Sequence, residues 1–188
     1  MPASSRTRES RFRQVLTSTA ATYAGTGRVL VAGVGYRNLR DLSAGPLIIE
    51  RLGAASLGER VDLEDLSYGP IDVLFLLQRR EPYAAAIFVA AEKRGRRPGS
   101  VHRAAWGFPA ITTEALQERI AEAVTGVISL ENLLHICGHF SALPSKVTVI
   151  EVEPVDDGWG ESVSEAGAAA VDAAVALVAS EVSRALEA

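Results

Sequence analysis

Residues 28–52 read RVLVAGVGYRNLRDLSAGPLIIERL and carry the clearest pattern of secondary structure in the chain. Its apolar run, 29–32, stops at Gly33-Val34-Gly35, and an amphipathic run, 44–52, follows a loop that contains Asp41. This order predicts a buried strand, a glycine turn and a helix, which is how a parallel α/β domain begins. Gly33 and Gly35 allow a sharp turn at the carboxyl end of the strand, where open α/β sheets place their sites.

The rest of the chain continues to alternate between strand and helix patterns. We expect strands at 28–33, 61–66, 84–91 and 147–152, and helices at 43–53, 70–78 and 164–186. A turn at 94–99 leads into a short edge strand at 101–105, which returns as a hairpin. Two more helices start at Thr112 or Thr113 and near Ser129, because these side chains can cap a helix. The order predicts a three-layer α/β/α sandwich around a mostly parallel sheet.

The chain divides into two parts by composition. Residues 1–27 form a basic N-terminal extension with four arginines and one acid, and 28–188 form a single domain. The extension is interpreted as a leader or a loosely docked helix, with a transit peptide or a basic partner-binding arm as the alternatives.

Bulk properties exclude several classes of function. The net charge of −4 disfavours a general nucleic-acid or membrane-surface binder, which needs clustered Lys and Arg. Cys137 is the single cysteine, so no internal disulfide can form, and this suits a reducing cytoplasm. No uninterrupted apolar run reaches the roughly 18 residues of a membrane span. We therefore expect a cytoplasmic protein that binds neither nucleic acid nor membrane.

Several segments resemble the hydrogenase maturation proteases, the endopeptidases that process [NiFe]-hydrogenases at the carboxyl terminus. The first motif of this family is Gly-x-Gly-Asn, four residues, Asp, an acidic residue and Gly-x-Gly. Gly33, Gly35, Asp41 and Gly45 keep its frame. Three later segments add to the resemblance: 88–99 resembles the third strand of the family and its turn, 130–154 resembles the second half, and the helix that opens at 162–164 resembles the closing helix. The resemblance covers about 28–187 and implies the same α/β fold.

The family resemblance also implies nickel as cofactor and the tail of a hydrogenase large subunit as substrate. The family holds the metal with an acidic residue, an Asp and a His. Carried over, these positions fall on Leu42, Ala90 and the region near Gly126, and no His lies between 103 and 134. Leu and Ala side chains cannot bind a cation, so we expect neither nickel nor any other cofactor.

Neighbouring carboxylates offer a displaced catalytic or metal site. Asp41 adjoins the lost acid, Asp65 ends the second strand, and Glu92 lies two residues beyond Ala90. The simpler interpretation is that Asp41 caps the helix after the glycine turn and that Glu92 belongs to a solvated strand end.

Four other patterns have both a structural and a functional interpretation. His135 and His139 share one helical face at a spacing that can bind zinc, but they lack a third ligand. The glycine turn lacks the third glycine of a dinucleotide fingerprint, although a phosphate could sit on the following helix near Arg37 and Arg40. The basic turn 94–97 is a solvated loop or a docking patch. The aromatic residues in predicted loops either pack back on the domain or mark a partner surface; they are Trp106, Phe108 and Trp159.

The leading hypothesis is a divergent, catalytically inactive member of this family that binds a protein or peptide. Its cleft is expected at the carboxyl edge of the sheet, lined by Gly33, Gly35, Asp41, Leu42, Ala90 and Trp106. The alternatives are an active endopeptidase that uses Asp41, Asp65 or Glu92, and an unrelated α/β protein that binds a small ligand or nucleotide.

Overall fold

A five-stranded sheet forms the centre of the protein. The computed structural model describes residues 27–55 and 57–187, so the predicted extension 1–27 lies outside the described residues except for Gly27. The strand order is β2-β1-β3-β5-β4. The first four strands in this order are parallel, and the edge strand β4 runs antiparallel to β5. The strand bounds are Val29–Val34 (β1), Val61–Asp65 (β2), Ala85–Ala91 (β3), Val101–Ala105 (β4) and Val147–Val152 (β5).

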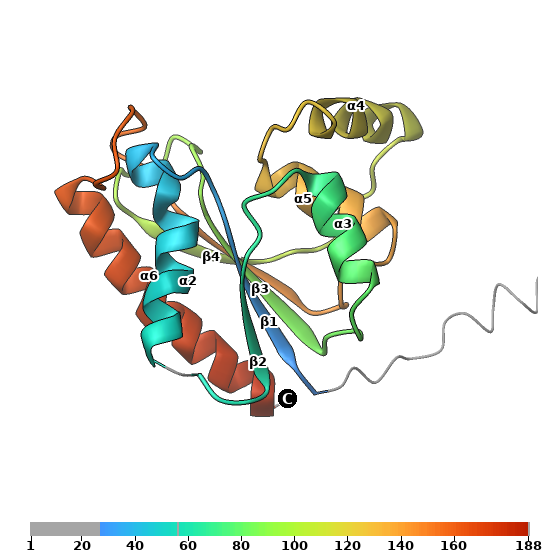
Figure 1. Cartoon of the computed structure of the whole chain (residues 1–188), viewed down its shortest axis with the longest axis horizontal. Helices are drawn as coiled ribbons and strands as arrows, with labels where there is room; N and C mark the ends of the chain where they lie inside the picture. Colours follow the sequence, from blue (N-terminus) through green and yellow to red (C-terminus); the bar gives the residue numbers. More distant parts are fainter. Residues whose placement is uncertain (1–26, 56, 188) are drawn as a thin grey trace, which may run out of the picture.

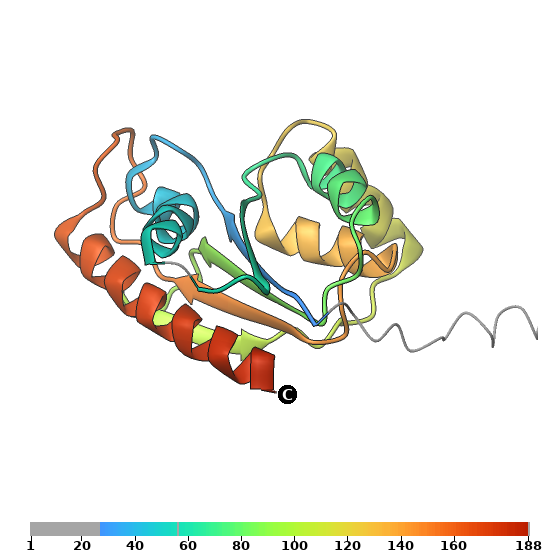
Figure 2. The ribbon, with the colours of Figure 1, turned by 60° about the horizontal axis from the view of Figure 1, so that its bottom comes forward.

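Helices cover both faces of the sheet (Figures 1 and 2). One face carries α2 (Ala44–Ala55) and α6 (Glu165–Glu187), and a short 3-10 helix, η1 (Arg40–Ser43), precedes α2. The other face carries α3 (Pro70–Gln78), α4 (Thr113–Ala123) and α5 (Leu130–His139). The predicted three-layer α/β/α sandwich around a mostly parallel sheet is therefore confirmed.

Buried strand residues alternate between two apolar cores, as the period of a strand requires. Leu30 and Phe88 face the core under α3, α4 and α5, whereas Val31 and Ile87 face the core under α2 and α6. Because β3 is buried on both sides, its sequence is a continuous apolar run rather than an alternating one. This pattern explains why the sequence located β3 correctly.

The predicted helix starts at Thr112 and Ser129 are confirmed. The Thr112 hydroxyl accepts a hydrogen bond from the Ala115 amide, and the Ser129 hydroxyl accepts one from the Asn132 amide. Among the described residues, α6 is the one helix long and apolar enough to cross a membrane by length and composition. Its Val171, Val178 and Val182 are buried in the core against the sheet, so α6 serves here as a core helix.

The prediction of a β3–β4 hairpin is wrong, because β5 lies between these two strands. The chain leaves β3, forms β4 at the outer edge, and later returns with β5 to fill the gap. The antiparallel direction of β4 carries its end, and therefore Trp106, to the start of β5, where the Trp106 amide donates to the Val147 carbonyl. Trp106 thus lies at the amino edge of the parallel strands.

Two glycines of the opening motif bring α2 against the sheet. A Cβ at Gly33 would collide with the carbonyl oxygen of Gly45, and a Cβ at Gly45 would collide with backbone atoms of Val34. Both positions must therefore lack a side chain for the start of α2 to pack against β1. The glycine frame is explained by this close approach, with no need for a bound phosphate.

Candidate functional site

A pocket of about 230 Å³ opens at the carboxyl edge of the sheet. One wall comes from the turn after β1 and from Leu42, a second from the end of β3 and the residues after it, and a third from the start of α5. The lining residues are Val34, Gly35, Tyr36, Leu42, Ala90, Ala91, Glu92, Lys93, Ile128, Ser129 and Leu130.

The loop after β1 holds this pocket in shape. The Tyr36 amide donates to the Leu42 carbonyl over 3.1 Å, which closes the loop on itself. The Tyr36 hydroxyl accepts a hydrogen bond from the Ile128 amide over 2.9 Å, which fixes the segment before α5. A Cβ at Gly35 would meet the Leu42 carbonyl oxygen at 2.5 Å, so the closed loop requires glycine there. The tyrosine, at the position of the motif's asparagine, thus joins two walls of the pocket.

Two of the positions onto which the family resemblance carries metal ligands line this pocket, and residues near the third position line it as well. Leu42 and Ala90 line it, and the region near Gly126 contributes Ile128 and Ser129. The side chains of Leu42, Ala90 and Ile128 have no donor atom for a metal, and the Ser129 hydroxyl is engaged as the cap of α5. Within the described residues, no group of three His, Cys, Asp or Glu side chains is placed to hold a metal ion. The residues present do not fit nickel.

Asp41 has a structural role that differs from the predicted cap of α2. Its side chain is completely buried. Its carboxylate accepts hydrogen bonds from the amides of Val155 (2.9 Å), Asp156 (3.0 Å) and Ser164 (2.7 Å), and from the Ser164 hydroxyl (2.8 Å). The Ser164 hydroxyl in turn accepts from the Gly167 amide at the start of α6. Asp41 therefore fastens the loop after β5 and the start of α6, and the predicted cap of α2 is wrong.

Burial works to raise the pKa of Asp41, but the hydrogen bonds from Ser164, Asp156 and Val155 outweigh it and hold that pKa below its usual range. A Cβ at Gly167 would collide with the Asp41 carboxylate, so α6 needs a glycine there to approach it. The sequence analysis did not predict this contact between Asp41 and the start of α6. The only local indication of it is the pattern Ser164-x-x-Gly167 at the start of the last helix.

Asp65 and the two arginines of the first loop are also engaged in the structure. The Asp65 carboxylate pairs with Arg37 at 2.5 Å and accepts from the Ser67 amide at 3.1 Å. Arg40 pairs with Asp156 at 3.3 Å and donates to the Trp159 carbonyl at 3.3 Å. Both arginines proposed to assist a phosphate therefore have protein partners.

Glu92 is the one acidic side chain that lines the pocket. It is partly buried, and among the described residues its carboxylate has neither a hydrogen-bond nor an ion-pair partner. Burial raises the pKa of Glu92; the positive charge of Arg94 opposes this shift, and the negative charges of Glu151 and Glu131 add to it. Glu92 thus follows the end of β3, as predicted, but it is only partly exposed to solvent and borders the pocket.

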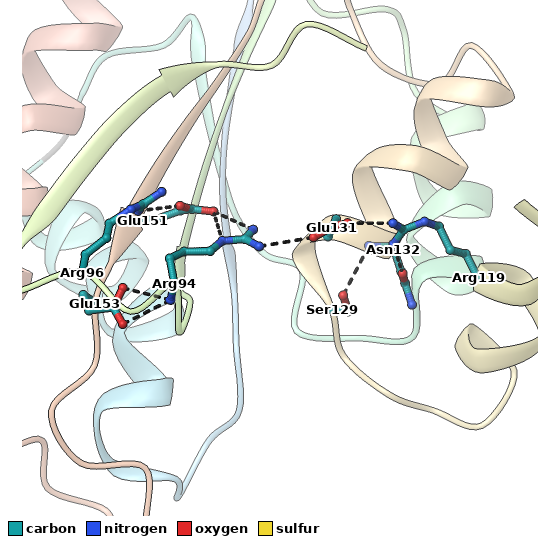
Figure 3. A network of polar contacts seen from close by, with 8 residues as sticks. All are labelled: Arg94, Arg96, Arg119, Ser129, Glu131, Asn132, Glu151 and Glu153. Carbon is teal, nitrogen blue, oxygen red and sulfur yellow. Dashed lines mark hydrogen bonds and ion pairs between the residues drawn. The ribbon is translucent and has the colours of Figure 1, made fainter. Parts of the chain in front are cut away.

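A network of charged side chains crosses from the turn after β3 to α5, next to the pocket (Figure 3). Arg94 pairs with Glu151 at 3.0 Å and with Glu131 at 3.3 Å, and Arg96 pairs with Glu151 at 2.7 Å. Glu131 also pairs with Arg119 of α4 at 2.7 Å. Two arginines of the predicted solvated turn 94–97 are thus held by carboxylates.

The backbone of the same turn is fixed by a second carboxylate. Glu153 accepts hydrogen bonds from the Arg94 amide at 3.0–3.1 Å (Figure 3) and from the Gly95 amide at 3.1 Å. Although burial works to raise the pKa of Glu153, these backbone donors lower it below its usual range. Local sequence patterns could not predict the network, because its acids lie on α5, on β5 and directly after β5, far along the chain from the turn.

A second pocket, also of about 230 Å³, lies beside Trp106 and the last turn of α5. Trp106 packs edge to face against His135, with ring centroids 5.1 Å apart, and His139 packs in the same manner against Phe140. The expectation that Trp106 lines the cleft with Leu42 and Ala90 is corrected by its place at the opposite edge. Of the expected lining residues, Gly35, Leu42 and Ala90 share the first pocket. Gly33 lies in β1 and Asp41 in η1, and neither lines this pocket.

The remaining candidates of α5 have ordinary structural environments. Burial, together with the charge of Arg119, lowers the pKa of His135, while Glu131 opposes this shift. Cys137 is fully buried, and burial raises the pKa of its thiol to about 12, so it is not a ready nucleophile. Trp159, by contrast, is 80% exposed on the loop before α6.

The sheet order, the glycine-framed first turn and the pocket at the carboxyl edge define an α/β protein with the fold of the hydrogenase maturation proteases. No protein-family model matches the chain, and no curated protein matches it by sequence. Solved structures do match, and they confirm the family resemblance at the level of the fold.

Three of these structures illustrate the likeness. The hydrogenase 2 maturation peptidase from Thaumarchaeota archaeon SCGC_AB-539-E09 is 29% identical, with a TM-score of 0.54 over 80% of this chain and 95% of that one. The maturation protease HycI from Thermococcus kodakarensis KOD1 is 19% identical, with a TM-score of 0.62 over 93% and 99%. The endopeptidase HybD from E. coli is 23% identical, with a TM-score of 0.58 over 80% and 89%.

Proposed function

We propose that this chain is a divergent, hydrogenase-maturation-protease-like protein that binds a protein or peptide segment in the pocket at the carboxyl edge of its sheet, without metal-dependent hydrolysis. The observation that carries this proposal is the lining of the pocket. Leu42 and Ala90 occupy two positions where the family motif carries metal ligands, and Ile128 lies beside them. The place of the metal chemistry is therefore taken by an apolar surface.

The structural relatives support a polypeptide as the occupant, because they are named as maturation peptidases and proteases. The apolar wall supports the burial of an apolar side chain, which contributes about 25 cal/mol for each Å² removed from water. The rival model of an active peptidase with displaced ligands is disfavoured by the engagement of Asp41 and Asp65 with protein donors. We place this activity in the cytoplasm, in keeping with the single, buried thiol.

The proposal is tested by selecting a displayed library of random dodecapeptides on the immobilised full chain. Enriched peptides are expected to contain apolar residues and to lose affinity for the double variant Leu42→Glu/Ala90→Asp, which places charge on the apolar wall. Circular dichroism establishes that this variant is folded, and Trp159→Ala is the control for the exposed loop. Equal binding by the double variant, or loss of binding in Trp159→Ala alone, would contradict the assignment of the pocket.

A further inference from the structure

The pocket contains one carboxylate without a partner among otherwise satisfied charges. Lys93, next to Glu92 in sequence, pairs with Asp157. Arg94 pairs with Glu151 and Glu131, and Arg96 pairs with Glu151. Lys93, Arg94 and Arg96 are therefore committed to other acids, and among the described residues Glu92, which lines the pocket, has no cationic partner.

The charges around Glu92 disfavour an anionic occupant. Its charged neighbours are Arg94, Glu131 and Glu151, so two of the three carry the same sign as Glu92 itself. Arg94 lies close enough to influence Glu92 but is hydrogen-bonded to Glu151 and Glu131 instead. A ligand carboxylate or phosphate would meet this excess of negative charge, whereas a cation would relieve it.

The geometry points to an occupant that carries a lysine or arginine side chain, whose cation pairs with the Glu92 carboxylate. This inference rests on the proposed function and names the chemistry of the bound segment. The aliphatic stem of such a side chain can pack along Leu42, Ala90 and Leu130 while its head reaches Glu92, because Lys and Arg bury their methylenes and keep the charge at the polar end. Burial at Glu92 strengthens the pairing relative to an ion pair at an exposed site.

The experiment is the same dodecapeptide selection, carried out on the full-length chain and on two variants. Glu92→Gln keeps the shape of the side chain and removes its charge. Glu81→Gln is the matched control, because Glu81 is an exposed acid in the loop between α3 and β3, at the opposite edge of the sheet. Individual enriched peptides are then resynthesised with each Lys or Arg replaced by norleucine, and their affinities are measured by calorimetry.

We expect enrichment of a basic residue flanked by apolar ones on the wild type and on Glu81→Gln. On Glu92→Gln the apolar preference should remain and the basic preference should disappear. A given basic peptide should bind Glu92→Gln at least about tenfold more weakly, and its norleucine version should bind both forms alike.

The outcomes separate this inference from the proposed function. Apolar peptides without a basic preference, or a basic preference that survives in Glu92→Gln, would overturn the pairing with Glu92 and leave the pocket assignment standing. If no peptide depends on Leu42 and Ala90, the proposed function fails and this inference fails with it.

Discussion

Asp41 and Glu92 are two acids at the same edge of one sheet, and they have opposite environments. Asp41 is completely buried and accepts four hydrogen bonds from three residues of a distant loop. Glu92 is partly buried beside an apolar pocket and accepts none from the described residues. The more buried carboxylate is therefore the structural one, and the less buried carboxylate is the one available to a ligand.

The pKa shifts of the two acids differ in sign for the same reason. Burial works to raise the pKa in both cases, but only Asp41 has enough donors to reverse the effect. A charge that is compensated stabilises the fold, and one that is not costs stability. Substitutions at the two acids and at their neighbours should therefore differ in sign and in size.

Asp41→Ala should produce the largest loss of stability. The substitution leaves the amides of Val155, Asp156 and Ser164 without their carboxylate acceptor, at a cost of about 3 kcal/mol in the free energy of unfolding. Urea denaturation measures this value. Asp41→Ser should not recover this loss, because a shorter side chain cannot reach these donors. Asp41→Asn retains one acceptor oxygen, so its stability should lie between that of Asp41→Ala and that of the wild type. Full recovery by Asp41→Ser would contradict the fastening role.

Gly167→Ala should destabilise the protein although it lies in a helix. Alanine favours a helix over glycine by about 1 kcal/mol, but the added Cβ would collide with the Asp41 carboxylate, and such overpacking costs about 1–3 kcal/mol. Gly53→Ala in α2 is the matched control, since nothing lies within 4 Å of its Cβ. Thermal unfolding should show a lower melting temperature for Gly167→Ala and an unchanged or higher one for Gly53→Ala. A gain at both positions would refute the contact.

Glu92→Gln should stabilise the free protein at neutral pH, by less than Asp41→Ala destabilises it. The raised pKa of Glu92 imposes a penalty that is complete above the folded-state pKa. The penalty fades as the pH falls through that pKa and is absent below the usual glutamate range, where both states are protonated. Melting temperatures from pH 8 to pH 3 should therefore show the gain shrinking with acidification.

Asp41→Asn should lower the melting temperature at neutral pH, whereas Glu92→Gln should raise it. The lowered pKa of Asp41 contributes stability above the usual aspartate range, and this contribution is lost as the pH falls through the folded-state pKa. The loss of stability caused by Asp41→Asn should thus shrink on acidification as well.

The Glu92 prediction would be contradicted if Glu92→Gln lowered the stability of the protein at pH 7, because that result would show that Glu92 has an internal partner.

Asp65→Asn should have the smallest effect. Asp65 pairs with Arg37, whose side chain is 66% exposed, so solvent screens the pair and its loss should cost no more than about 1 kcal/mol. The effect should diminish further in 0.5 M salt. If Asp65→Asn cost as much stability as Asp41→Ala, the exposure of an acid and its partners would not predict how much that acid contributes to stability.

The features that could be predicted from the sequence are those set by nearby residues. The apolar run of β3, the caps Thr112 and Ser129, and the glycine frame around Gly33 each depend on local periodicity or close packing. The sequence also predicted that Leu42 and Ala90 line the same cleft, because the turn after β1 and the end of β3 lie at one edge of a parallel sheet.

The features that could not be predicted depend on contacts between distant segments. The insertion of β5 between β3 and β4 moved Trp106 to the opposite edge, and local patterns carry no record of strand order. The donors of Asp41 lie more than 110 positions further along the chain. Likewise, the lack of a partner for Glu92 follows from Arg94 reaching Glu131 across the network.

Metal binding by the purified full chain distinguishes an apolar pocket from a rebuilt metal site. The chain is incubated with nickel or zinc, desalted and analysed by mass spectrometry, beside Glu92→Gln and Asp65→Asn. Because Leu42, Ala90 and Ile128 offer no donor atoms, we predict that the retained metal stays far below stoichiometric and is the same in all three proteins. Retention of about one nickel ion per chain, lost in Glu92→Gln or Asp65→Asn, would show that displaced ligands have rebuilt the metal site and would contradict the account.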